Sequence, residues 1–124
     1  LREFHPSISL ADYPAKLASL NLDLALAPLE FHLFNDCKSN LRLLEYGVCG
    51  SPVICSDTQA YHGHLPCTRV TPTSPEQWLQ AIRMHRADPD ASYRMGDELR
   101  EIVLSDYMLR GDNLLSWVNG WLAD

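Results

Sequence analysis

The sequence predicts an α/β protein with a Rossmann-like parallel sheet and flanking helices. Short apolar segments of strand length alternate with amphipathic segments of helical length, which is the pattern of parallel α/β folds. The segment 52–56 is apolar at nearly every position, as in strands that are buried on both faces. With 124 residues, the chain is expected to form a single domain, residues 1–124. Its first residues read like the middle of a longer protein, so we expect a truncated domain.

The first half of the chain is expected to contain, in order, strand 3–9, helix 13–20, strand 22–28, loop 29–37, helix 38–49 and strand 52–56. Asp12 is placed to cap the first helix, and Pro14 lies in its first turn, where proline is tolerated. The strand before Pro28 is the clearest, because leucines alternate with smaller residues along it. The following helix is expected to end before Gly50, since glycine often follows the last helical residue.

The second half is expected to contain loop 57–66, strand 67–71, helix 75–86, helix 88–107 and a closing C-terminal helix at 108–122. The four residues from Ser74 to Gln77 read as a capping box with proline at the first helical position. The buried side of that helix is expected to carry Trp78, Leu79, Ile82 and Met84. Gly111 is expected to interrupt the helical pattern before the last segment.

Composition and charge narrow the range of functions. The proportions of hydrophobic residues (46%) and charged residues (21%) are those of a folded globular protein. The net charge of −6 argues against binding to nucleic-acid polymers, although a single nucleotide needs only a few local cations. No apolar run approaches the ~20 residues of a membrane span. We therefore expect a cytoplasmic location, with peripheral attachment to the inner membrane for the full-length protein, and free thiols.

The segment 34–54 carries the pattern that points to chemistry. Lys38, Arg42 and Glu45 recur at helical spacing on one side of the helix expected there. The opposite, apolar stripe consists of Leu41, Leu44 and Val48. The free N–H groups and the dipole at a helix start favour phosphate, and a glutamate further along can accept hydrogen bonds from hydroxyl groups. The pattern predicts a sugar-nucleotide site, while spacing alone also fits a solvated helix face with an ion pair.

The same segment resembles the donor-binding half of GT-B-fold glycosyltransferases of the family 4 or group 1 type. Many of these read roughly E-x7-E-A-x-A-x-G-x-P-V-I, and one bacterial subset reads F-N-x-x-K-S-x-x-K-x-L-E-Y-x-x-x-G-x-P-V-I. This chain fits the second form from Phe34 to Ile54, with Arg42 at the second lysine position. The resemblance covers most of residues 12–122, although only about twenty positions carry it specifically.

The resemblance implies roles for particular residues. Glu45 matches the glutamate that binds the ribose hydroxyls, and Cys37 stands where the family has its first glutamate. The helix start holds the donor diphosphate in the family. The donor-binding set is therefore expected to be Asn35, Asp36, Cys37, Lys38, Ser39, Asn40 and Glu45. No catalytic residue is assigned, because the family's basic pair and its acceptor domain would precede residue 1. No metal or cofactor beyond the nucleotide-sugar substrate is implied.

The function implied by the resemblance is transfer of a hexose from a nucleotide-sugar to a glycan or lipid-linked acceptor, in bacterial surface polysaccharide or O-antigen synthesis. The acceptor would bind through a missing N-terminal domain, so this piece alone is expected to be inactive. Apolar surface left uncovered by the missing part is expected to let the piece form a homodimer. Two alternatives stay open: a non-catalytic α/β interaction module, and a GT-B-fold sugar-nucleotide epimerase or phosphorylase.

Two other groups of residues have plainer interpretations. His62, His64, Cys67 and Cys55 could be zinc ligands, but their spacing matches no closed zinc module, so a polar loop is favoured. The tryptophans of the last segment, Trp117 and Trp121, are one helical turn apart. Their apolar neighbours favour packing in a core or against another domain.

Overall fold

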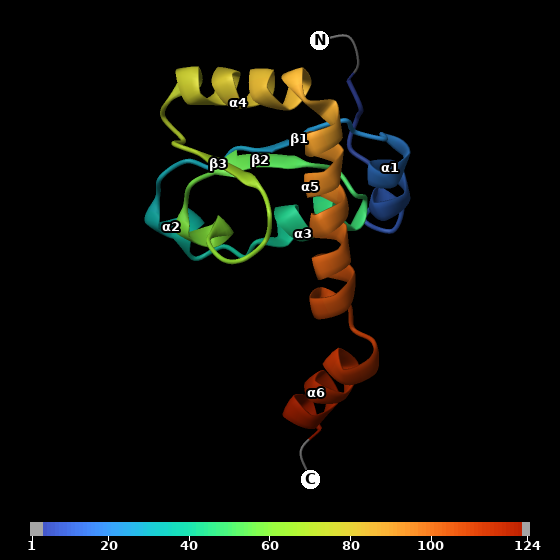
Figure 1. Ribbon diagram of the computed structural model, residues 1–124. Coiled ribbons are helices and arrows are strands. Elements are labelled where there is room, and N and C mark those ends of the chain that lie inside the picture. The colour runs from blue at the N-terminus through green and yellow to red at the C-terminus, as the bar shows by residue number, and fades with distance from the viewer. Residues whose placement is uncertain (1–3, 123–124) are drawn as a thin grey trace.

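The computed structural model describes residues 4–122 and shows a mixed α/β arrangement around a small parallel sheet (Figure 1). The sheet has three strands in the order β1-β2-β3, namely β1 (Ala25–Ala27), β2 (Val53–Ser56) and β3 (Thr68–Val70). Leu26 lies opposite Ile54 on the first pair of strands, and Ile54 lies opposite Thr68 on the second. Because all strands run in the same direction, their carboxyl ends meet at one edge of the sheet.

The helices among the described residues are α1 (Tyr13–Ser19), α2 (Leu33–Asp36), α3 (Leu41–Val48), α4 (Pro75–Ala87), α5 (Pro89–Ile102) and α6 (Gly111–Trp121), with a 3₁₀ turn η1 (Gln59–Tyr61) and a π-helical turn η2 (Val103–Tyr107). Figure 1 shows α3 on one face of the sheet and α4 on the other. Helix α5 passes the end of the sheet where β2 begins, and α6 projects from the body. None of the helices in residues 4–122 combines the length and apolar character needed to cross a lipid bilayer.

The core has two layers separated by β2, which is buried along its whole length. The larger layer lies on the α3 side and contains Ala25, Ala27, Leu43, Val53, Cys55, Ala60, Tyr61, Leu65, Leu99 and Val103. The smaller layer lies under α4 and contains Ile54, Val70 and Ala81, with Leu24, Trp78 and Ile82 packed against it. The full burial of β2 confirms the prediction of a strand covered on both faces.

The faces of β1 differ from what its leucine pattern suggests. The small residues Ala25 and Ala27 are buried against the α3 side, whereas 43% of Leu26 is exposed on the α4 side. Helix α4 makes most of its contacts with the sheet through β2 and β3. The α4 side of β1 is therefore only partly covered at Leu26.

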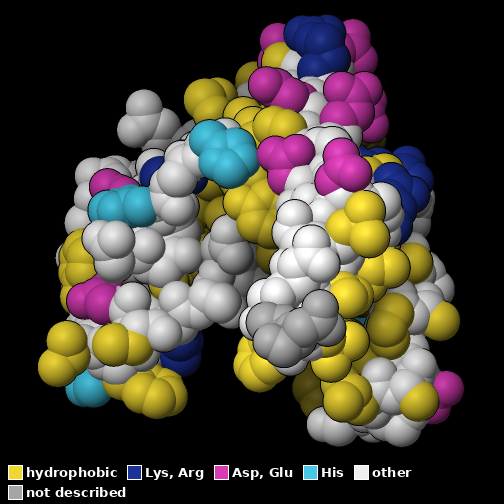
Figure 2. Space-filling view, turned by 90° about the horizontal axis from the view of Figure 1, so that it is seen from below, with side chains coloured by type: hydrophobic (Ala, Val, Ile, Leu, Met, Phe, Trp, Pro, Cys, Tyr) yellow, Lys and Arg dark blue, Asp and Glu magenta, His cyan; other side chains and the backbone are white. Residues whose placement is uncertain are grey.

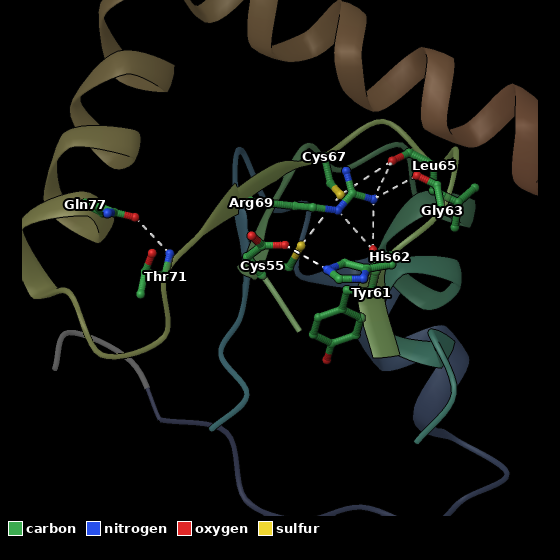
Figure 3. A network of polar contacts seen from close by, with 10 residues as sticks. Cys55, Tyr61, His62, Gly63, Leu65, Cys67, Arg69, Thr71 and Gln77 are labelled. Atoms are coloured by element: carbon green, nitrogen blue, oxygen red, sulfur yellow. Dashed lines mark hydrogen bonds and ion pairs between the residues drawn. The ribbon is translucent and has the colours of Figure 1, made fainter. Parts of the chain in front are cut away.

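The end of α3 and the start of α4 are formed by the residues predicted for them. Gly50 follows α3 with a left-handed φ of 76°, as a C′ glycine does. Ser74 caps α4 by accepting a hydrogen bond from the Gln77 N–H at 3.4 Å. The reciprocal half of the capping box is absent, because the Gln77 side chain accepts the Thr71 N–H instead, at 2.8 Å (Figure 3). That bond ties the start of α4 to the end of β3.

The N-terminal predictions are partly wrong. Residues 4–9 form no strand, since no neighbouring strand pairs with them; residue 3 of the predicted strand lies outside the described residues. Asp12 occupies the N-cap position of α1 but does not cap it, because its carboxylate accepts a hydrogen bond from the Ser9 hydroxyl at 2.6 Å. The loop predicted at 29–37 contains the short helix α2, whose start is capped by His32 through a bond from the Phe34 N–H at 3.1 Å.

The helical predictions need three corrections. The helix expected from residue 38 begins only at Leu41, because residues 38–40 form a turn between α2 and α3. The helix expected over 88–107 changes to π-helical geometry at Val103. On α4 the buried residues are Ala81 and His85, while Leu79 and Met84, expected on the buried side, are more than half exposed.

The last segment is a helix, as predicted, but it does not close over the body. The helix is interrupted at residues 108–110, which are not helical. Gly111 begins α6 with a φ of 53°. None of the α6 residues is buried. Trp117 and Trp121 pack on each other, with ring centroids 6.1 Å apart, rather than in a core of the described residues.

Candidate functional site

A hollow of about 570 Å³ lies beyond the carboxyl end of β1, between that strand and α3. We call it the β1 hollow; its lining is Leu26, Ala27, Pro28, Leu29, Lys38, Ser39, Leu41, Arg42, Tyr46 and Tyr61. Its volume is within the range of small-molecule sites. Ligands of open parallel sheets bind at this end of the strands, so the hollow is where the architecture favours a site.

The charged groups of the β1 hollow are two cations. Lys38 belongs to the turn before α3, and its Nζ atom lies 5.1 Å from the centroid of the Phe34 ring. Arg42 projects from the first turn of α3. Among the described residues that line the hollow, none is acidic. The hollow therefore suits an anion, and the backbone N–H groups at the start of α3 lie beside it.

Loops from two strands hold the walls of the hollow in place. The Leu29 N–H donates to the Ser56 hydroxyl at 2.7 Å, which fastens the loop after β1 to the end of β2. Tyr61 comes from η1 and is 96% buried, with 4% of its surface exposed. Burial raises the pKa of Tyr61, so its hydroxyl stays protonated at neutral pH and can donate a hydrogen bond.

Arg42 also belongs to a second group of contacts, which we call the Tyr13 triad (Tyr13, Arg42 and Glu45). Its Nη1 atom donates to the Tyr13 hydroxyl at 2.7 Å and to Glu45 Oε2 at 3.0 Å. The Tyr13 hydroxyl donates to the same Oε2 at 3.2 Å. Partial burial alone would lower the pKa of Arg42, but Tyr13 and Glu45 together raise it, so the guanidinium stays charged.

Glu45 does not line the β1 hollow. It lies at the rim of an apolar groove of about 330 Å³ between α1, α3 and η2, which we call the α1–α3 groove. The groove is lined by Tyr13, Pro14, Leu17, Leu41, Leu44, Glu45, Val48, Cys49, Val103, Tyr107 and Met108. Leu41 lines both depressions, and Arg42 bridges from the hollow to Glu45. A polar hollow and an apolar groove thus meet across the first turn of α3.

The seven residues predicted to bind the donor do not all lie in one depression of the structure. Lys38 and Ser39 line the β1 hollow, and Glu45 lines the α1–α3 groove. The other four, Asn35, Asp36, Cys37 and Asn40, line neither depression. Asn35 instead closes its own loop by donating to the Glu30 carbonyl at 2.9 Å, and the exposed Cys37 follows the last residue of α2.

Sequence reasoning missed the tyrosines of the site. Tyr61 reaches the hollow from a turn after β2, and Tyr13 reaches Glu45 across 32 positions of sequence. No local pattern signals such a contact, because it depends on how α1 packs beside α3. The one available signal was the parallel order of strands, which brings the loops after β1 and β2 to the same edge.

The four residues that could be zinc ligands, His62, His64, Cys67 and Cys55, do not gather into one cluster in the described part of the chain. His62 pairs with Asp57, with 3.0 Å between Nε2 and Oδ1, and His64 lies 3.7 Å from a carboxylate oxygen of Asp106. Across residues 4–122, no three His, Cys, Asp or Glu side chains gather closely enough to hold a metal ion. Cys55 and Cys67 do lie together, with 3.6 Å between their sulfur atoms.

Comparison with known proteins adds no relative to this description. No protein-family model, no curated protein and no solved structure matched the chain. The candidate site therefore has to be judged on its own geometry.

Proposed function

We propose that this chain is the donor-binding, C-terminal part of a GT-B-fold glycosyltransferase with a Rossmann-like sheet. The observation that carries the proposal is the placement of Lys38, Ser39 and Arg42 around one hollow at the carboxyl end of β1. The hollow would take the diphosphate of a nucleotide-sugar. The full-length enzyme would transfer a hexose to a glycan or lipid-linked acceptor of a bacterial surface polysaccharide, with the acceptor bound by a separate domain.

The chemistry of such a transfer explains why cations are needed here. As the glycosidic bond to the nucleoside diphosphate breaks, negative charge grows on the leaving phosphate oxygen. Fixed cations and backbone N–H groups stabilise that charge more strongly in the transition state than in the bound substrate. Lys38, Arg42 and the N–H groups at the start of α3 are suitably placed for this role.

The α1–α3 groove would take the nucleoside. Its apolar walls suit the faces of a sugar and a base, and Glu45 at the rim can accept hydrogen bonds from ribose hydroxyls. Both contacts made by Glu45 use Oε2, and no hydrogen bond from the described residues reaches Oε1. That oxygen is available to a ribose hydroxyl while Tyr13 keeps its hydrogen bond to Oε2.

Titration calorimetry on the purified chain tests the proposal. The ligands are UDP, GDP and dTDP sugars, with inorganic pyrophosphate as a probe of the phosphate site alone. Lys38→Ala removes a charged hydrogen-bond donor, whose loss costs about 1.5–3 kcal/mol and weakens both kinds of ligand roughly tenfold or more. Glu45→Ala should weaken the nucleotides but leave pyrophosphate unchanged, because only nucleotides carry ribose.

Lys16→Ala is the matched control. Lys16 is the only other lysine of the chain, and it lines neither the β1 hollow nor the α1–α3 groove. It should bind every ligand as the unsubstituted protein does. If the folded chain binds none of these ligands, or if Lys38→Ala and Lys16→Ala behave alike, the proposed donor site is wrong.

A further inference from the structure

Two thiols face each other beside the candidate site, on the face of the sheet that carries the larger core layer. Cys55 belongs to β2 and is fully buried, while Cys67 lies just before β3 and is half-buried. Their Sγ atoms are 3.6 Å apart, and the Cys55 thiol donates to the Cys67 sulfur (Figure 3). The other two cysteines, Cys37 and Cys49, are exposed and lie elsewhere in the fold.

The Cys67 side is built around a single arginine. The Arg69 guanidinium donates to the Tyr61 carbonyl at 3.0 and 2.8 Å, and to the Gly63 and Leu65 carbonyls at 3.3 Å each. The Cys67 thiol donates to the same Leu65 carbonyl at 3.5 Å. The loop 57–66 is thereby held against β3 with a positive charge next to the thiol pair (Figure 3).

These surroundings give the two thiols different reactivity. The hydrogen bond from Cys55 lowers the pKa of Cys67, and the charge of Arg69 acts in the same direction. The thiolate is the reactive form of cysteine. Cys67 is half-buried and within reach of an oxidant, whereas Cys55 is fully buried. Cys67 is therefore the sulfur that reacts first, and Cys55 is positioned to react with it second.

We propose that Cys55 and Cys67 form a peroxide-sensitive dithiol that closes to a reversible intramolecular disulfide. The Cys67 thiolate attacks one oxygen of a hydroperoxide; the S–O bond forms, the O–O bond breaks, and the other oxygen leaves as an alcohol or water after taking a proton. The Cys55 sulfur then attacks the Cys67 sulfenic acid; the S–S bond forms, and the hydroxyl leaves as water with the Cys55 proton. The two thiols lose two electrons, and the peroxide gains them.

The geometry requires only a modest adjustment. A disulfide bond is about 2.05 Å long, so the sulfur atoms must approach by about 1.5 Å. Rotation of the half-buried Cys67 side chain, away from its hydrogen bond with the Leu65 carbonyl, would have to supply this approach. The bond would tie the end of β2 to the loop that carries Tyr61, a wall of the β1 hollow. The inference depends on the thiol pair alone and not on nucleotide binding.

The test is exposure of the folded, full chain to a low-millimolar concentration of hydrogen peroxide, followed by alkylation in denaturant and mass spectrometry. We expect two of the four cysteines to escape alkylation, and a cross-linked peptide pair containing Cys55 and Cys67. Dithiothreitol should restore all four alkylation sites. Recovery of four alkylated cysteines after peroxide, or disulfides only between chains, would overturn the proposal.

Matched variants assign the order of the steps. Cys37→Ser with Cys49→Ser removes the two exposed thiols, and it should still form the cross-link. Cys55→Ala should stop at the sulfenic acid, which dimedone traps on Cys67. A dimedone adduct on Cys37 or Cys49 in place of Cys67 would contradict the assignment of the reactive sulfur. If a variant does not fold, the cross-link measured in the unsubstituted chain still tests the proposal.

Discussion

Gly96 is a point of close approach between helix α5 and the turn that follows α3. A Cβ atom added at Gly96 would lie 2.9 Å from the Pro52 nitrogen and closer still to the Gly50 carbonyl oxygen. Both neighbours are backbone atoms of the turn that leads into β2. They cannot move aside as the end of a flexible side chain can, so the helix or the turn must shift. We therefore expect Gly96→Ala to destabilise the fold.

The size of the effect follows from two opposing contributions. Forcing an extra carbon into a packed interior costs typically about 1–3 kcal/mol, and contact with rigid backbone places this case at about 3. Alanine is favoured over glycine within a helix by about 1 kcal/mol. The net loss is about 2 kcal/mol of unfolding free energy. For a domain of this size, that loss lowers the melting temperature by roughly 6–10 °C.

Thermal unfolding followed by circular dichroism, together with urea unfolding, measures this loss. Gly120→Ala is the control, because Gly120 is also in a helix but a Cβ there would meet nothing within 4 Å. It should leave the melting temperature unchanged or slightly raised. If Gly96→Ala proves as stable as the unsubstituted chain, the close packing of α5 against the Gly50–Pro52 turn is not as described, and the position of α3 would need to be reconsidered.

Two further predictions concern pH and association. His85 is buried between Thr68 and Ser92, and this burial lowers its pKa. As the pH falls, the unfolded chain therefore takes up the His85 proton before the folded chain does. The free energy of unfolding should fall as the pH drops below about 6.5, the ordinary pKa of histidine. Urea unfolding at pH 7.5 and 6 should show a smaller difference for His85→Gln than for the unsubstituted chain; equal differences would refute this. The chain exposes 8866 Å², whereas a compact monomer of its mass exposes about 6,700 Å², so we expect self-association through apolar faces such as that of α6. Sedimentation should show it, and Leu115→Gln with Trp121→Gln should reduce it; a monomer at high concentration would contradict it.

The expected self-association depends mainly on apolar side chains on the face from which α6 projects. Figure 2 shows hydrophobic side chains gathered there, and every α6 residue is at least partly exposed. Leu115 and Trp121 are 59% and 74% exposed. The hydrophobic period of α6 correctly predicted a helix. It could not predict whether a partner covers the apolar stripe, because an amphipathic pattern is the same in either case.

Local chemistry was the most predictable part of the fold. Ser74 and Gly50 act as helix boundaries because a side-chain acceptor and a left-handed glycine work through adjacent atoms. The alternation of strands and helices correctly predicted a parallel sheet, because the length and the hydrophobic period of each segment are also local properties. The predicted start of α3 was three residues too early. Residues 38–40 are compatible with a helix, but the chain makes a turn there after α2.

The candidate site was less predictable because it depends on contacts between distant segments. The sequence grouped Lys38 with Glu45 on one helix face, but the structure places them on two different depressions. Two tyrosines supplied by α1 and η1 complete those depressions, and neither is near the motif in sequence. Leu26 illustrates the same limit, since alternation identified the strand but not which of its faces is covered.

The ion pair between Arg42 and Glu45 fits both the plain interpretation of this helix face and a ligand site. More than half of the Arg42 side chain is exposed, so an i,i+3 pair of this kind contributes only about 0.2–0.5 kcal/mol. A hydrogen bond from a guanidinium to a phosphate contributes more, about 1.5–3 kcal/mol. A phosphate in the β1 hollow would therefore have to replace two contacts of the Arg42 Nη1 atom, the ion pair with Glu45 at 3.0 Å and the hydrogen bond to the Tyr13 hydroxyl at 2.7 Å. Tyr13 would keep its hydrogen bond to Oε2, and the carboxylate would remain in place for ribose.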